Sequence, residues 1–258
     1  MQVREFYDRL EARIPKSLSC DWDNDGLMCC PCSDTEVSKV LVALDVTGPV
    51  VEYAKEKGYD VILSHHPLIY KGLKSLDDND YVSSKLISLA AAGISVMSFH
   101  TRLDAVEGGV NDKLAELLGL SDTEPLYEEG IPLGRVGNLS VSMRPEEFSK
   151  NVKEILGIPF VLLSDANMRV RRVAVVGGNG RDLIPEARRA GADTFVSGRL
   201  DYHSMTDAPD QKVKKMNLIE AGHFFTEDPV CSVLRDFTLE IDSNIECEIY
   251  SSNAIKVV

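Results

Sequence analysis

The sequence lacks the long apolar runs that mark membrane proteins. No stretch approaches the roughly 20 apolar residues of a membrane span. The first residues, MQVREFYDRLEARIPKSL, also lack the apolar core of a secretory signal peptide. We therefore expect a cytoplasmic protein without a membrane partner.

Positive charge is scarce. The chain has 28 Lys and Arg residues against 41 Asp and Glu residues, which gives a formal net charge of -13. General nucleic-acid binders work through basic patches, so this composition argues against nucleic acid as a partner. A small nucleotide stays compatible with the charge where metal ions or backbone amides offset its phosphates.

Cysteine is present, but not in the spacing of a disulfide framework or a zinc ribbon. Four of the six residues lie close in sequence, namely Cys20, Cys29, Cys30 and Cys32. They contain one C-x-x-C, whereas a structural zinc site normally needs a second such pair. We expect the cysteines to be free thiols, and the sequence assigns no role to Cys29, Cys30 or Cys32.

Several catalytic motifs are also missing. No G-x-S-x-G nucleophile elbow and no evident Cys and His pair support covalent catalysis. Gly177-Gly178-Asn179-Gly180 lies between a predicted strand and a helix, yet it fits neither a P-loop nor the dinucleotide fingerprint, whose third glycine is Leu183 here. Two interpretations stay open: a tight turn, or phosphate binding through the amides of Gly178 and Gly180.

What is present is an alternation of helices and buried strands. Apolar spacing predicts helices over 2–13, 49–57, 81–92 and 109–118. Continuous apolar runs predict strands over 37–45, 60–64 and 94–99. Such strands joined by helices are typical of a parallel sheet that is covered on both faces.

The pattern occurs twice along the chain. Residues 37–64 align without a gap with residues 170–197, which matches Gly58 with Gly191 and Asp60 with Asp193. We therefore expect an α/β fold of two related, mainly parallel-sheet lobes with an approximate internal two-fold repeat. The first lobe would span 1–125 and the second 126–258. Residues 121–143 between the predicted repeats are expected to be loop-rich, with one strand.

All five histidines lie at or just beyond the ends of predicted strands. They are His65, His66, His100, His203 and His223. The carboxyl ends of parallel strands share one sheet edge, where residues far apart in sequence can converge. Two carboxylates occupy matching positions, Asp104 four residues after His100 and Glu227 four residues after His223. This placement predicts a metal centre.

Imidazole and carboxylate groups suit zinc, manganese, iron, cobalt or nickel. The expected ligands are His65, His66, Asp104, His223 and Glu227. A tetrahedral catalytic ion takes three protein ligands and a water, so this set predicts two divalent ions per subunit. A single histidine at a strand end is more often only a satisfied polar residue. The adjacent pair favours the metal interpretation, since Pro67 stiffens the exit of the strand and both imidazoles can reach different ions.

Five sequence blocks resemble the signature of a known family in order and extent. They are Asp21-Trp22-Asp23-Asn24-Asp25-Gly26-Leu27, Ser64-His65-His66-Pro67-Leu68, His100-Thr101-Arg102-Leu103-Asp104, Ser197-Gly198 with Tyr202-His203, and Glu220-Ala221-Gly222-His223-Phe224-Phe225-Thr226-Glu227. Together they resemble the NGG-one-interacting-factor-three-like family, whose members carry the name GTP cyclohydrolase I type 2.

The resemblance implies a two-lobed protomer, a toroidal homohexamer and a dinuclear metal site that faces an internal cavity. It implies the same five ligands, with Glu227 bridging the ions and with His203 and His100 beside them as catalytic residues. Three residues depart from the family pattern. Asp25 replaces an apolar residue, Arg102 replaces Asn, and Arg199 stands where an acidic residue is common. Arg102 and Arg199 would alter the charge near the pocket, which puts the substrate implied by the family in question.

Three functions are consistent with these features. The first is a metal-dependent hydrolase of a nucleotide or related heterocycle, with GTP as the family's substrate. Metal-activated water would open the purine imidazole ring and release formate, His203 would carry protons, and Gly178 and Gly180 would hold phosphate. The second is a non-enzymatic metal-handling protein or interaction scaffold. The third is a two-metal phosphoesterase.

Overall fold

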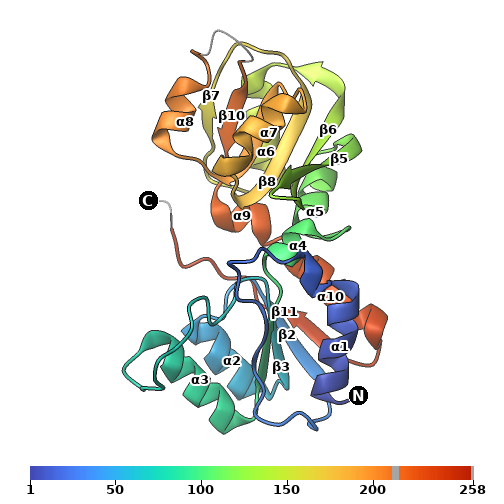
Figure 1. Ribbon diagram of the computed structural model, residues 1–258, viewed down its shortest axis with the longest axis vertical. Coiled ribbons are helices and arrows are strands. Elements are labelled where there is room, and N and C mark those ends of the chain that lie inside the picture. The colour runs from blue at the N-terminus through green and yellow to red at the C-terminus, as the bar shows by residue number, and fades with distance from the viewer. Residues whose placement is uncertain (211–214, 257–258) are drawn as a thin grey trace. The chain divides into compact units, whose positions relative to one another are not determined.

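The computed structural model describes residues 1–210 and 215–256, which form two compact units (Figure 1). The first unit contains residues 1–106 and 230–252, and the second contains 107–229 and the segment from 253 onward. Each unit is built around one mixed sheet with helices packed on it, which confirms the α/β class. In the part of the chain that is described, no helix has the length and apolar character needed to cross a membrane.

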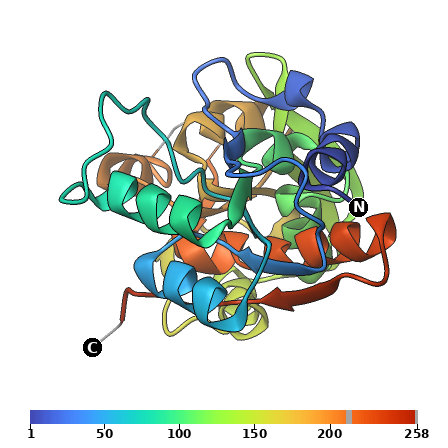
Figure 2. The same ribbon diagram turned by 90° about the horizontal axis from the view of Figure 1, so that it is seen from below.

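The first unit has a five-stranded sheet in the order β1-β4-β3-β2-β11. Its strands are β1 (Gly26–Cys29), β2 (Lys39–Ala43), β3 (Val61–Ser64), β4 (Ser95–Ser98) and β11 (Glu246–Ile249). All neighbours are parallel except β1, which runs antiparallel to β4. Figure 2 shows β11 at one edge, beside β2, so the C-terminal part of the chain completes a sheet that begins near the N-terminus.

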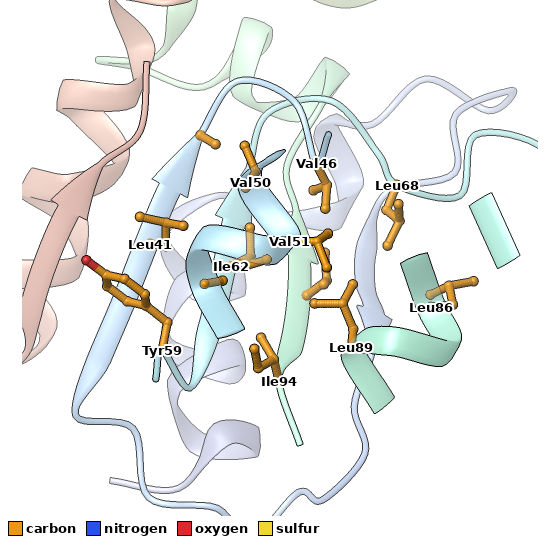
Figure 3. Close-up of a cluster of buried hydrophobic side chains, with 13 residues drawn as sticks. Leu41, Val46, Val50, Val51, Tyr59, Ile62, Leu68, Leu86, Leu89 and Ile94 are labelled. Carbon is orange, nitrogen blue, oxygen red and sulfur yellow. The ribbon is translucent and has the colours of Figure 1, made fainter. Parts of the chain in front are cut away.

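Helices cover both faces of this sheet. One face carries α2 (Gly48–Lys57) and α3 (Tyr81–Ala92), and the other carries α1 (Val3–Arg13) and α10 (Val230–Ile241) (Figure 1). Alternate strand residues such as Leu41 and Ile62 point toward α2 and α3, where they meet Val51 and Leu89 in a buried cluster (Figure 3). The strands are buried on both sides, which explains their continuous apolar sequences.

Local signals fix the ends of two helices in this unit. The Thr47 side chain accepts a hydrogen bond from the Val50 amide at the start of α2, and α2 ends at Gly58 in the left-handed region. The Asp80 carboxylate caps α3 in the same way, and α3 ends at Gly93. The observed ends confirm the helices predicted over 49–57 and 81–92.

The second unit has a six-stranded sheet in the order β5-β6-β8-β9-β10-β7. Its strands are β5 (Ser121–Glu128), β6 (Ile131–Met143), β7 (Leu162–Ser164), β8 (Val170–Asn179), β9 (Thr194–Arg199) and β10 (Asn217–Glu220). Only β8, β9 and β10 are parallel to one another, whereas the other three pairings are antiparallel. The prediction of a mainly parallel sheet is therefore wrong for this unit.

The difference arises in the segment that was expected to be loop-rich. Residues 121–143 form a hairpin of two long strands, joined by Glu129 and Gly130, which both have positive φ as a tight hairpin turn requires. Most of β5 is exposed, so it lacks the apolar alternation that marks a half-buried strand. Its sequence therefore resembles a loop.

Short helices pack around this second sheet. They are α5 (Val110–Leu117), α6 (Pro145–Ile155), α7 (Ile184–Arg189), α8 (Tyr202–Asp207) and α9 (His223–Glu227). Leu114 of α5 and Phe148 of α6 pack against Val173 and Val175 of β8 in one buried cluster. The helix α4 (Thr101–Ala105) belongs to the first unit and directly follows His100.

The aligned sequence segments have the same local structure in both units. Strand β2 pairs with β3 in the same register as β8 pairs with β9, when the two segments are superposed by the sequence alignment. Asp60 precedes β3, and its carboxylate accepts the amides of Ser38 and Lys39 at the start of β2. Asp193 makes the equivalent bonds in the second unit, to the amides that begin β8. Each aspartate ties one parallel strand to the next.

Candidate metal centre

The carboxyl ends of β3 and β4 bring three histidines together in the first unit. Ser64 and Ser98 are paired at these strand ends, with their hydroxyl oxygens 2.8 Å apart. His65 and His66 follow β3, and His100 follows β4. The sequence therefore places all three side chains beyond the same edge, as predicted from the parallel arrangement.

The three imidazoles form a compact cluster. The ring centroids of His65 lie 5.0 Å from His66 and 5.2 Å from His100, and the remaining pair is 5.7 Å apart. One ring nitrogen from each lies within 4.8 Å of the others. His65 is fully buried, and the other two are partly exposed. This spacing suits nitrogen donors that share one or two ions.

Each imidazole is oriented through its Nδ1 atom. The Nδ1 atom of His65 lies 3.0 Å from the Phe99 carbonyl oxygen. Those of His66 and His100 lie 2.7 Å from Asp45 Oδ1 and 2.9 Å from Asp23 Oδ1. An acceptor at Nδ1 fixes the tautomer whose lone pair is on Nε2, which is the usual arrangement of a metal-ligating histidine.

Asp23 and Asp45 are functional candidates that the sequence analysis did not single out. Burial by itself would raise the pKa of Asp23, but hydrogen bonds from His100 and Thr101 outweigh it and lower that pKa to about 2. Asp23 is thus a carboxylate at neutral pH and a permanent acceptor for His100. The available signals were the position of Asp45 just beyond β2 and of Asp23 within the Trp22 block.

A carboxylate donor stands beside this cluster. Asp104 lies on α4, with its Oδ1 atom 3.9 Å from His65 Nε2. A separation of this size is too long for a hydrogen bond and fits two ligands of one ion. The first unit therefore combines predicted ligands His65, His66 and Asp104 with His100.

The second unit holds the other two predicted ligands as a pair. His223 and Glu227 occupy the first and last positions of α9, four residues apart on one face. His223 Nε2 lies 2.8 Å from Glu227 Oε2, and the Glu227 side chain is almost fully buried. A buried carboxylate next to imidazole is a second N/O donor set.

The glycines of β8 bring this strand close to α9. A Cβ atom on Gly178 would lie 2.1 Å from Glu227 Oε1, and Gly178 has φ +59. The amides of Gly177, Gly178 and Gly180 donate to the side chains of Asn111, Thr226 and Ser197, respectively. These glycines are thus explained by close packing, and their amides already have protein partners, so we make no phosphate-binding proposal for Gly178 or Gly180.

His203 lies in a different setting, on the short helix α8. Its imidazole is exposed and lines a cavity of 440 Å³ in the second unit, together with Arg181, Arg188 and Asp201. Burial lowers the pKa of the Arg188 guanidinium. The cavity therefore combines an imidazole that can carry protons with cationic and anionic side chains.

The cysteines form no disulfide within the described residues. Burial raises the pKa of the Cys29 thiol, whereas a hydrogen bond with Thr35 lowers that of Cys32. None of them belongs to a group of three or more metal donors in residues 1–210 and 215–256.

Comparison with known proteins confirms the resemblance. The sequence profile of Duf34/NIF3 (NGG1p interacting factor 3) matches residues 1–256. A Clostridium perfringens protein named GTP cyclohydrolase 1 type 2 homolog is 33% identical over 255 residues, which cover 95% of each chain. A protein of the same name from Methanocaldococcus jannaschii is 32% identical and covers 97% of this chain and 99% of its own.

Solved structures show the same fold. The Staphylococcus aureus hypothetical protein SA1388 is 28% identical, with a TM-score of 0.88 over 100% of this chain and 99% of its own. Reduced HcgD from Methanocaldococcus jannaschii is 30% identical, with a TM-score of 0.83 over 96% of this chain and 97% of its own. The arrangement of two mixed sheets is thus shared with proteins of known structure.

Proposed function

Because this chain belongs to the Duf34/NIF3 family, we propose that it is a metal-dependent hydrolase of a nucleotide or related heterocycle, with GTP as the first candidate substrate. The names of its relatives, GTP cyclohydrolase 1 type 2 homolog, suggest this substrate. One observation carries the proposal. Three imidazoles have Nδ1 against protein acceptors, which leaves the Nε2 lone pairs available, and one ring nitrogen of each lies within 4.8 Å of the others.

We propose two divalent ions per chain. Their ligands would be His65, His66, Asp104, His223 and Glu227, with Glu227 bridging. Five donors are more than one tetrahedral catalytic ion takes, since such an ion normally has three protein ligands and a water. The donors suit zinc, manganese, iron, cobalt and nickel alike, so elemental analysis is needed to identify the metal.

When bound, such ions lower the pKa of a coordinated water to about 7 and supply a nucleophile at neutral pH. The protein's own part is to orient the ligands and to move protons. Asp23 and Asp45 hold the rings of His100 and His66, respectively. The ring nitrogens of these histidines are therefore already oriented before a metal ion binds. His203 is the proposed proton carrier, because its imidazole is exposed beside a cavity that also presents Arg181.

The proposed reaction consumes two water molecules for each formate released. The first adds to the purine carbon between the two imidazole-ring nitrogens and opens the ring, which leaves a formamide. The second cleaves the formamide to formate and an amine. His203 would supply the proton that the departing nitrogen needs. Arg181 and Arg188 line the cavity beside His203, together with Asp182, Asp201 and Asp207.

The test is metal analysis followed by a product assay. Protein purified without chelators should carry two ions per chain and release formate from GTP. His66→Ala and Glu227→Ala should lose both properties, whereas Glu52→Gln, in an exposed pair with Lys55, should keep them. Metal-loaded protein that is inert toward a panel of nucleotides would contradict the proposal.

The same assay separates the alternatives. Release of phosphate instead of formate, from GTP and from simple phosphate esters, would indicate a two-metal phosphoesterase. Ions that exchange no water would instead indicate a structural or metal-handling role. We also propose a homohexamer, which light scattering on the purified protein tests directly.

A further inference from the structure

Trp22 and Tyr70 form an exposed aromatic pair beside the histidine cluster of the first unit. Their ring centroids are 6.5 Å apart at an interplanar angle of 66°, and Trp22 lies 6.2 Å from the His100 ring. The Trp22 side chain is 59% exposed, and that of Tyr70 is 52% exposed. Contiguous exposed aromatic surface of this kind marks an interaction site more often than it marks packing.

The backbone that carries Trp22 is held by the segment that carries His100. Trp22 lies in a turn closed by a hydrogen bond from the Asp23 amide to the Cys20 carbonyl oxygen, 3.0 Å long. The Asp23 carboxylate accepts from His100 on one oxygen and from Thr101 on the other. The position of the indole is therefore coupled to that of His100.

Tyr70 is held in a similar way. The Asn24 side-chain amide donates to the carbonyl oxygen of Ile69, the residue before Tyr70. The loop after His66 has no helix or strand until α3 begins, and long loops of this kind are usually functional. Tyr70 lines a cavity of 490 Å³ in this loop, together with Leu68 and Leu73.

We propose that the Trp22 indole stacks on the planar ring of an aromatic heterocycle, and that Tyr70, whose ring is tilted by 66° from the indole, contacts the edge of that ring and holds it beside His100. The inference rests on the proposed function and deepens it, because it assigns recognition of the substrate's ring to Trp22 and Tyr70. Stacking tolerates any base, since each has a π face. An uncharged ring also suits a chain whose formal charge is -13, which repels free polyanions.

Trp22 is the only tryptophan of the chain, so its fluorescence reports directly on this site. Metal-loaded protein is titrated with guanosine, with cytidine and with ribose 5-phosphate, which lacks an aromatic ring. Both nucleosides should quench the emission in a saturable way, and ribose 5-phosphate should not. Calorimetry then gives guanosine affinity for variants that lack the fluorophore.

Trp22→Ala and Tyr70→Ala should each weaken guanosine binding roughly 5-fold to 150-fold, the range expected for one lost stacking contact. Trp22→Phe keeps a ring and should retain most of the affinity. The matched control is Tyr127→Ala, because Tyr127 is also 52% exposed but lies on β5 in the other unit. It should bind guanosine as the unaltered protein does.

Equal guanosine affinity in all variants, or no quenching by either nucleoside, would overturn the inference. So would blue-shifted Trp22 emission that acrylamide cannot quench in the ligand-free protein, since a second copy of the chain would then cover the pair.

Metal affinity is measured on the same samples. Trp22-dependent nucleoside binding without metal binding or turnover would refute the proposed function and leave this inference standing. Metal binding and turnover with unchanged nucleoside affinity in the variants would refute only the inference.

Discussion

Asp25 and Arg102 form a buried ion pair in the first unit, with Arg102 Nε 3.0 Å from Asp25 Oδ2 and both side chains 0% exposed. Burial alone would lower the pKa of Arg102, but the Asp25 carboxylate and the hydrogen bonds to Tyr7 and Glu11 together outweigh burial and raise that pKa. The sequence resemblance set both residues apart, as two of the three departures that it implies. The structure shows that they are ion-pair partners, so each charge compensates the other. Asp25 also accepts the His100 amide, which connects the pair to the histidine cluster.

The first prediction concerns this pair. Arg102→Asn should cost up to about 3–5 kcal/mol of the free energy of unfolding, because it breaks the buried ion pair and leaves Asp25 with Lys16 as its counter-charge. The double change Asp25→Val with Arg102→Asn should cost less than Arg102→Asn alone. Urea unfolding measures both. Arg9→Ala removes an exposed pair with Glu5 and should cost about 0.5 kcal/mol or less. A double variant less stable than the single variant would contradict the compensation.

The second prediction concerns the carboxylate behind His66. Asp45→Asn should weaken metal binding by about 10-fold to 100-fold, because an amide no longer offers His66 a charged acceptor at Nδ1. Competition with a chromophoric chelator gives the affinity. Glu52→Gln, on the surface of α2, serves as the control and should bind metal normally. Unchanged affinity in Asp45→Asn would show that Asp45 does not orient a ligand.

The third prediction compares two glycines with positive φ in the second unit. Gly119 has open space around its Cβ direction, so Gly119→Ala should cost only about 1–2 kcal/mol of the free energy of unfolding, from the left-handed backbone. Gly178→Ala meets the same backbone cost and also collides with Glu227. It should therefore displace the Glu227 carboxylate and reduce the bound metal, as elemental analysis would show. Full metal content in Gly178→Ala would exclude Glu227 as a ligand.

The fourth prediction concerns the pH dependence of stability. The Glu248 carboxylate of β11 accepts hydrogen bonds from Tyr59 and Tyr53, which lower its pKa from the usual 4.5. A carboxyl group whose pKa is lower in the folded state stabilises the fold above its unfolded pKa. That stabilisation is lost as the pH falls through the folded pKa. With metal removed from both samples, the unaltered protein should thus be more stable than Glu248→Gln at neutral pH. The difference in the free energy of unfolding, measured by urea titration, should shrink below pH 4.5. A difference that does not change with pH would contradict this account.

Much of the fold follows from local sequence. Continuous apolar runs identify β2, β3 and β4, since these strands are buried on both faces. The helices between them end at glycines that adopt the left-handed conformation, as at Gly58 and Gly93. The hairpin of β5 and β6 could not be predicted in the same way. Its first strand is mostly exposed, and its stability comes from pairing with β6 rather than from apolar periodicity.

The sequence by itself determined the alternating elements and the placement of histidines beyond strand ends, because burial patterns and helix caps act over a few neighbouring residues. Only the tertiary structure decided which groups hold those histidines and which charges become partners. Asp23 reaches His100, and Asp25 reaches Arg102, across 77 positions of the chain. Such contacts depend on which strands become neighbours in the sheet, and no local pattern of residues encodes that choice.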